Sequence, residues 1–231
     1  MTSAVPEPGN ETCDEARAQP GKRLVWLAPP QLPPWPVVWF LLEGDPRHGE
    51  PDRALHLWGL AVDDGESEPE IEVISSELGD DGGRRAWKRF VVRAGGILER
   101  HPHARWVHYS DREMDRLRHY VARYGAPAGF LEHVEEASFD LLARGVRRSV
   151  RLPHDSDSLG EVAGCAGFHW RNPDSSPAWS VVQHRKARAS TDPAERARML
   201  KEVVGHTAHG LLAMRAVWRW LLRDGPRAYC G

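Results

Sequence analysis

The apolar run Val37–Leu42 limits the fold of this chain more than any other part of the sequence. It is short and rich in β-branched and aromatic side chains, which predicts a strand that is buried on both faces. A strand of this kind has to lie inside a sheet, with further elements packed above and below it. The 231 residues of the chain are enough to build one domain with a sizeable core around such a sheet.

The segments that follow alternate between strand and helix patterns. Leu55–Val62 and Glu70–Ser75 predict two more strands, which turn-rich stretches join to the first as an antiparallel meander. Apolar residues at helical spacing predict a helix at Arg84–Arg100, and a strand at Arg105–Tyr109 precedes a second helix at about Asp111–Tyr124. This order predicts an α/β domain with a partly antiparallel sheet.

The last third of the chain is predicted to be mostly helical. Asp192 is a suitable N-cap, Pro193 fits the first helical turn, and Glu195 completes a capping box. Gly205 and Gly210 interrupt the apolar pattern that follows, so one kinked helix and two separate helices are both compatible with it.

Both ends of the chain are predicted to lie outside the folded domain. Residues 1–31 are rich in proline and lack periodicity, which is typical of a disordered N-terminal tail. Residues 32–223 are predicted to form one domain, and residues 224–231 a short C-terminal tail.

Charge and composition exclude several kinds of protein. The 31 basic and 33 acidic residues give a formal net charge of -2, which is not the balance of a protein that binds DNA through bulk charge. No apolar run approaches the roughly 20 residues of a membrane helix, and the N-terminus lacks the pattern of a signal peptide. We therefore expect a soluble, cytoplasmic protein with no membrane partner.

Acidic residues near the predicted strand ends are the first candidates for chemistry. Glu43 and Asp45 follow the first strand, where two carboxylates are well placed to hold a divalent metal. From this pair alone, a polar strand end followed by a Gly-Asp-Pro turn is the preferred interpretation. Glu113 falls in the first turn of a helix, where an acid either complements the helix dipole or points back over the sheet edge. Asp140 interrupts an apolar stretch, where it requires a partner, a metal or a turn position.

Basic residues and histidines form two further candidate groups. The densest basic cluster supplies candidate phosphate contacts, with a solvated helix face as an equal alternative. Its members are Arg144, Arg147, Arg148 and Arg151. His206 and His209 lie three residues apart, which is metal-ligand spacing on one helix face, although 12 histidines make such spacings common by chance.

Five short motifs stand in order along the predicted elements: Phe40–Pro46, His108–Glu113, Phe139–Leu141, Ser156–Gly160 and His206–Gly210. Together they resemble the YprB-type ribonuclease H-like domain, which is found at the C-terminal end of predicted RecB-like nucleases and is related to the DEDD 3′-to-5′ exonucleases. In that family the five motifs read Phe-Asp-Ile/Leu-Glu-Gly-Asp-Pro, His-Tyr-x-x-x-Glu, Val-Asp-Leu, Ser-Tyr-Ser-Leu-Lys and Tyr-Asn-x-x-Asp.

The resemblance covers about Leu32 to Leu222. It implies an α/β, ribonuclease H-like fold, with a mixed central sheet, helices on both of its faces and a helical C-terminal third. It implies nucleic acid, and a helicase or another DNA-processing protein, as partners. In the family, carboxylates from the first strand, the second motif and the last helix hold two metal ions that drive phosphodiester hydrolysis. Here Leu41 and Gly210 stand where the first and the last Asp would be, and Gly160 stands where the family has Lys.

These departures predict the loss of the two-metal site, because two cations lying close together need several anionic oxygens around them. The resemblance therefore implies a degenerate nuclease domain without hydrolytic activity and without a resident cofactor. Such a domain is expected to act as a nucleic-acid-binding or protein-interaction module. We also expect Leu41 to pack as part of the core.

The alternative is an active nuclease that depends on Mg or Mn and has a rearranged carboxylate site. Its members would be Glu43, Asp45, Glu113 and Asp140, with Glu43 and Glu113 as the metal ligands. A one-residue shift of the last motif leaves His209 as a replacement for the lost Asp, in a site better suited to zinc or manganese than to magnesium.

Overall fold

The computed structural model describes residues 23–44, 55–76, 81–172 and 176–229. A five-stranded sheet lies at its centre, with the strand order β4-β3-β2-β5-β6. The strands are β2 (Val37–Gly44), β3 (Leu55–Asp63), β4 (Glu70–Ser75), β5 (Arg105–His108) and β6 (Ser138–Asp140). The first three form an antiparallel meander, whereas β5 runs parallel to β2 and β6 parallel to β5. The predicted meander and mixed sheet are confirmed.

Strand β2 is the middle strand, and all eight of its residues are buried. Its side chains alternate between two separate hydrophobic cores, one on each face of the sheet. Val37, Trp39 and Leu41 belong to one core, and Val38, Phe40 and Leu42 to the other. Two-sided burial is the reason why this segment is a continuous apolar run, and the expected core position of Leu41 is confirmed.

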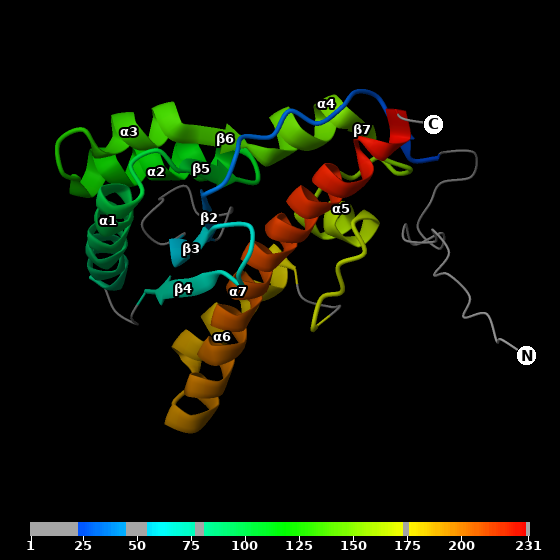
Figure 1. The fold of residues 1–231 in the computed structure, drawn as a ribbon. Coiled ribbons are helices and arrows are strands. Elements are labelled where there is room, and N and C mark those ends of the chain that lie inside the picture. The colour runs from blue at the N-terminus through cyan, green and yellow to red at the C-terminus, as the bar shows by residue number, and fades with distance from the viewer. Residues whose placement is uncertain (1–22, 45–54, 77–80, 173–175, 230–231) are drawn as a thin grey trace, which may run out of the picture.

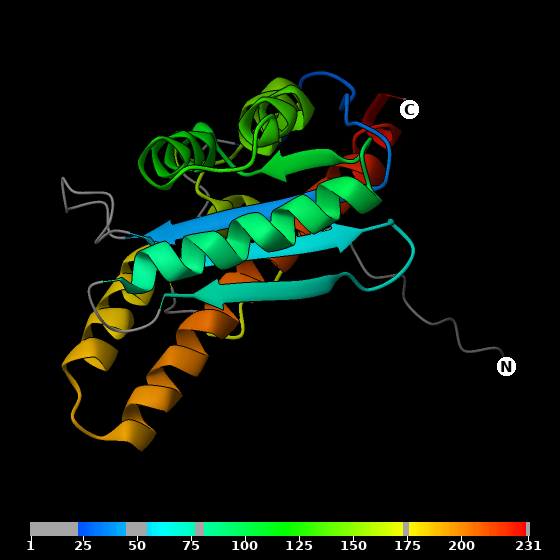
Figure 2. The same ribbon diagram turned by 90° about the vertical axis from the view of Figure 1, so that its left-hand side faces the viewer.

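Helices cover both faces of the sheet, as predicted (Figures 1 and 2). On one face lie α1 (Gly82–Arg100), α2 (Asp111–Tyr124) and α3 (Phe130–Ala137), whose apolar residues join the core of Phe40. On the other face lie α5 (Leu159–Cys165) and α7 (Pro193–Asp224), with α6 (Pro177–Ala189) packed against α7. Figure 2 shows α1 crossing in front of the strands and α7 passing behind them.

The last helix, α7, is a single helix of 32 residues. Gly205 and Gly210 both lie inside it, so the choice between one helix and two is settled in favour of one. Asp192 caps its start through a hydrogen bond from the backbone N–H of Ala194 to its Oδ1 at 2.8 Å, as the sequence predicts.

Short elements complete the chain. After β6 come the π-helical turn η3 (Leu141–Val146), α4 (Arg147–Ser149) and β7 (Val150–Arg151), and the 3-10 turn η4 (Arg227–Tyr229) follows α7. Within the described ranges, none of the helices combines the length and the apolar character that crossing a membrane requires.

The folded domain begins earlier than the predicted Leu32. Strand β1 (Val25–Trp26) pairs antiparallel with β7, and the ring of Trp26 lies 5.2 Å from that of Trp220. Strand β1 was not predicted from the sequence, because a two-residue strand has too little periodicity to detect and a proline-rich stretch follows it. The rest of the predicted tail, residues 1–22, lies outside the described residues, and so does Asp45.

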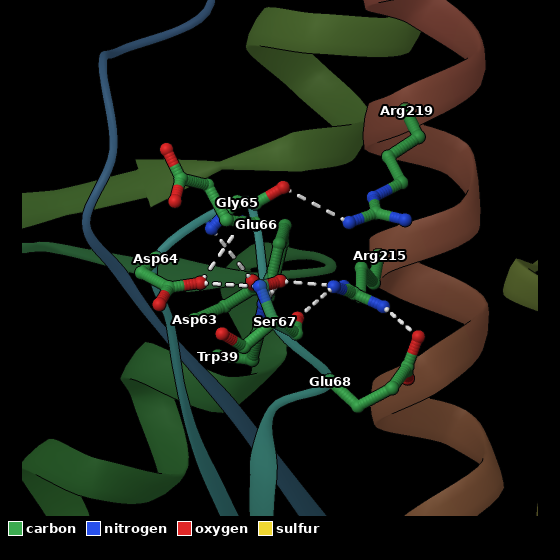
Figure 3. Close-up of polar contacts among 9 residues, drawn as sticks. All are labelled: Trp39, Asp63, Asp64, Gly65, Glu66, Ser67, Glu68, Arg215 and Arg219. Atoms are coloured by element: carbon green, nitrogen blue, oxygen red, sulfur yellow. Dashed lines mark hydrogen bonds and ion pairs between the residues drawn. The ribbon is translucent and has the colours of Figure 1, made fainter.

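A buried ion pair fastens α7 to the turn between β3 and β4 (Figure 3). Asp63 Oδ2 accepts hydrogen bonds from Arg215 Nε at 2.8 Å and from Trp39 Nε1 at 3.0 Å. The side chain of Asp63 is fully buried and that of Arg215 is 6% exposed. Arg215 also binds Glu68 at 3.0 Å, and Arg219 donates to the carbonyl of Gly65 at 3.0 Å. Two arginines of α7 thus hold the turn between β3 and β4 in place.

Removal of Asp63 tests how strongly the fold depends on this pair. Asp63→Ala leaves the Arg215 guanidinium buried and without its main partner, so the free energy of unfolding is expected to fall by about 3–5 kcal/mol. Glu68→Ala is the matched control, because Glu68 binds the same arginine from a side chain that is 82% exposed; its cost should stay below about 1 kcal/mol. Chemical denaturation measures both values, and equal losses for the two variants would contradict the argument.

Candidate functional site

A cavity of about 760 Å³ opens at the edge of the sheet where β2 and β6 end. Each of the five sequence motifs contributes to its lining. The contributions are Leu41–Gly44, Tyr109–Glu113, Asp140, Ser156–Gly160, and His206 with Gly210. The structure therefore brings segments that are up to 169 positions apart in the sequence, from Leu41 to Gly210, to one place.

The parallel arrangement of three strands explains this convergence. Because β2, β5 and β6 run in the same direction, the segments that leave their C-terminal ends meet at one edge of the sheet. Glu43 is the next-to-last residue of β2, and Asp140 pairs with His108 at the end of β5. Helix α2 starts two residues beyond β5 and carries Glu113 in its first turn.

Glu43 lies at the back of this cavity and is 9% exposed. Ser180 Oγ donates a hydrogen bond to Glu43 Oε2 at 2.9 Å, whereas Glu43 Oε1 lies 3.9 Å from His206 Nε2. Burial raises the pKa of Glu43 to about 7, although the Ser180 hydroxyl and the charge of Arg116 act in the opposite direction. Near neutral pH this carboxyl group is therefore poised between its two protonation states.

Glu113 is used by the fold as part of a helix cap. Its Oε2 accepts hydrogen bonds from the backbone N–H of Ser110 at 3.1 Å and from Ser110 Oγ at 3.2 Å, which completes a capping box. Burial raises the pKa of Glu113 as well. Arg116, one turn further along, donates a hydrogen bond to the carbonyl of Leu42 and so ties α2 to the end of β2.

Asp140 has a structural partner of the kind that a turn position provides. Its Oδ1 accepts a hydrogen bond from the backbone N–H of Ala143 at 2.6 Å, so it caps the start of η3. Three of the four predicted acids, Glu43, Glu113 and Asp140, thus line one cavity, and two of them also cap helical turns.

Leu41 and Gly210, which stand where the resemblance places two metal-binding Asp residues, face each other across β2 and α7. A Cβ atom built on Gly210 would lie 2.6 Å from Leu41 Cδ2. The Leu41 side chain is buried in the same core as Leu211 and Met214 of α7. Hydrocarbon therefore fills the space between the strand and the helix, and the residues present do not fit a pair of metal ions there.

The four arginines of the predicted cluster differ in their contacts. Arg144 lies over the ring of Phe139, with its guanidinium carbon 4.7 Å from the ring centroid. Arg147 donates two hydrogen bonds to Asp157 Oδ2, at 2.8 and 2.6 Å. All four arginines are exposed, but of the four Arg147 alone lines the cavity. They belong to three consecutive short elements, η3, α4 and β7.

Of the two candidate histidines, His206 lines the cavity. Its ring lies between those of Trp170 and Trp179, with centroid distances of 5.5 and 5.7 Å, and burial lowers its pKa to about 4. His209 is not part of the described lining, and its Nδ1 accepts a hydrogen bond from the backbone N–H of Arg171 at 3.3 Å. The residue of α7 that packs on Leu41 is Gly210 and not His209.

Three residues of the site were not identified from the sequence: Arg116, Trp170 and Ser180. Trp170 follows α5 in a stretch without periodicity, and Ser180 contacts Glu43 across a sequence separation of 137 residues. Arg116 stands on a helix face that reads as an ordinary polar face. No local signal in the sequence marks any of these residues as part of a site.

In the part of the chain that the structure describes, no three His, Cys, Asp or Glu side chains are grouped so that they could hold a metal ion. Comparison with protein-family models, with curated proteins and with solved structures finds no match to this chain.

The contact between Leu41 and Gly210 predicts that Gly210→Ala destabilises the protein when Leu41 is present and stabilises it when Leu41 is replaced by alanine. Gly210→Ala should lower the free energy of unfolding by roughly 1 kcal/mol, because overpacking outweighs the gain in helix propensity. In a Leu41→Ala background the same substitution should raise it, since the added methyl group fills space that Leu41 has left. Gly205→Ala is the control, because no atom lies within 4 Å of its Cβ position, and it should stabilise both backgrounds. Equal effects of Gly210→Ala in both backgrounds would exclude the contact.

Burial of Glu43 predicts a pH-dependent stability difference between the protein and Glu43→Gln. Because the folded state raises the pKa from 4.5 to about 7, stability is lost as the pH rises through this interval. The glutamine variant, which can still accept the Ser180 hydrogen bond, lacks this loss. Its advantage in free energy of unfolding should therefore grow by about 3 kcal/mol between about pH 4.5 and pH 8, as measured by denaturation across the range. A constant difference would mean that Glu43 titrates as an exposed acid.

Proposed function

We propose that this chain is a degenerate ribonuclease H-like domain that lacks phosphodiester hydrolysis and works as a binding module. The ribonuclease H-like assignment is supported by the sheet, in which a meander of three antiparallel strands is followed by two strands parallel to the first. It is supported further by the way in which five separate motifs line one cavity.

The observation that carries the proposal is the packing of Leu41 against Gly210. In two-metal hydrolysis the ions generate the nucleophile and stabilise the charge that develops on the leaving oxygen, so the chemistry is lost with the ions. Two divalent cations held a few ångströms apart require anionic oxygens between and around them. A leucine on one side and a glycine on the other supply none.

The cavity itself supports a binding role. Its volume of about 760 Å³ falls in the range of typical small-molecule sites, and its lining combines apolar side chains such as Leu41 and Trp170 with many charged and polar ones. The resemblance proposes nucleic acid and a helicase or another DNA-processing protein as partners. The alternative is that the same cavity binds a protein partner.

The competing function is an active nuclease with a rearranged carboxylate site. Its support is the presence of Glu43, Glu113 and Asp140 in the lining of one cavity. Its difficulty is that Glu113 and Asp140 already accept hydrogen bonds from backbone N–H groups as helix caps, which leaves their oxygens only partly available to a metal.

A nuclease assay with a matched variant separates these two functions. The purified protein should not cleave single-stranded DNA, duplex DNA or RNA with Mg²⁺ or Mn²⁺ above the level of Glu43→Gln, a variant expected to fold. Equal residual cleavage in both proteins identifies a contaminating nuclease, because only Glu43 differs between them. Cleavage that disappears in Glu43→Gln while the fold is retained would overturn the proposal in favour of the rearranged site.

A further inference from the structure

The described lining of the cavity contains more carboxyl groups than cationic groups. The carboxyl groups belong to Glu43, Asp111, Glu113, Asp140, Asp157 and Glu161. The cationic groups belong to Arg112, Arg116 and Arg147. Arg147 is already bound to Asp157, so the remaining arginines face five carboxyl groups. Such a lining repels a phosphate group and favours a cation.

A second and independent feature is the polar group at the back of the cavity that has no partner. The side chain of His206 is 6% exposed, and its Nδ1 has no hydrogen-bond partner among the described residues. The distance of 3.9 Å from His206 Nε2 to Glu43 Oε1 is too long for a hydrogen bond. A buried polar atom without a partner costs stability, so a hydrogen-bonding group that reaches His206 Nδ1 from the cavity would relieve this cost.

The walls around this pair are aromatic and aliphatic. Trp170 is half-buried in the lining, and its ring stacks on His206 at an interplanar angle of 29°. Leu41 and Leu142 line the same cavity. An aromatic face attracts a cation, and an aliphatic floor gains from contact with a hydrocarbon stem. A bare metal ion would make no use of either surface.

We infer that the cavity binds a guanidinium group carried on a hydrocarbon stem, of the kind that an arginine side chain presents. The planar head would donate hydrogen bonds to Glu43, and the stem would lie along Leu41 and Trp170. This inference rests on the proposed function, since an occupied two-metal site would leave no room for the ligand.

Two probes distinguish an arginine of a partner protein from a free small molecule. Agmatine represents the free alkylguanidine, and the blocked peptide acetyl-Gly-Arg-Gly-amide represents the protein side chain. Each should bind in isothermal titration at about pH 8, and acetyl-Gly-Gln-Gly-amide should not. Binding of the peptide without agmatine assigns the site to a protein partner, whereas binding of both means that a free alkylguanidine is also accepted.

Variants locate the binding in the cavity. Glu43→Gln should weaken both probes at least tenfold, and Trp170→Leu should weaken them less. Glu68→Gln, an acidic substitution at the far end of the sheet, should leave binding unchanged. In the unmodified protein the affinity should rise from about pH 6 to about pH 8 as Glu43 ionises. Glu113 and Arg116 of α2 and His206 of α7 face Glu43, and the rise should vanish in Glu43→Gln.

Four results would overturn the inference. Binding that survives in Glu43→Gln would place the ligand elsewhere. Binding of single-stranded DNA that Glu43→Gln abolishes would assign the cavity to nucleic acid. Absence of binding by both guanidinium probes, in a protein without nuclease activity, would refute the inference and leave the proposed function intact. Stabilisation by Mn²⁺ through Glu43, together with Glu43-dependent cleavage, would refute both.

Discussion

The burial of β2 on both of its faces is the constraint on which the rest of this structure depends. A strand without a solvent-facing side chain can place polar groups only at its two ends. The buried polar groups next to β2 do lie at its ends. Asp63 pairs in register with Val37 at the start of β2, and Glu43 lies at its other end. The buried ion pair and the cavity thus lie at the two ends of one apolar strand.

Helix α7 connects these two ends. Arg215 binds Asp63 near the start of β2, while Gly210 packs on Leu41 and His206 approaches Glu43 near its end. The charged contact fixes the position of the helix along the strand. The glycine then allows the helix to come close enough for the Leu41 side chain to fill the gap. One helix thus contacts both ends of the central strand.

The sequence predicted the parts of this fold that have local signals. The apolar run of β2, the helical spacing of α1 and the capping residue of α7 all lie within a few positions of the elements that they define. The pairing of Asp63 with Arg215 spans 152 positions, and that of Trp26 with Trp220 joins the two ends of the chain. Neither pair leaves a pattern in either segment, so neither could be predicted.

The candidate site shows the same division. Glu43, Glu113 and Asp140 were found because acids next to apolar runs are conspicuous, but their hydrogen bonds decide what they do. Glu113 and Asp140 stabilise helical turns, which is sufficient reason for an acid at those positions. Glu43 caps no helix, and at neutral pH its burial costs stability that an apolar residue would not. Glu43 is a buried acid with a raised pKa, and it lines an acidic and aromatic cavity. A functional requirement therefore explains an acid at this position better than a structural one does. With hydrocarbon between Leu41 and Gly210, that requirement is better met by holding a ligand than by holding two metal ions.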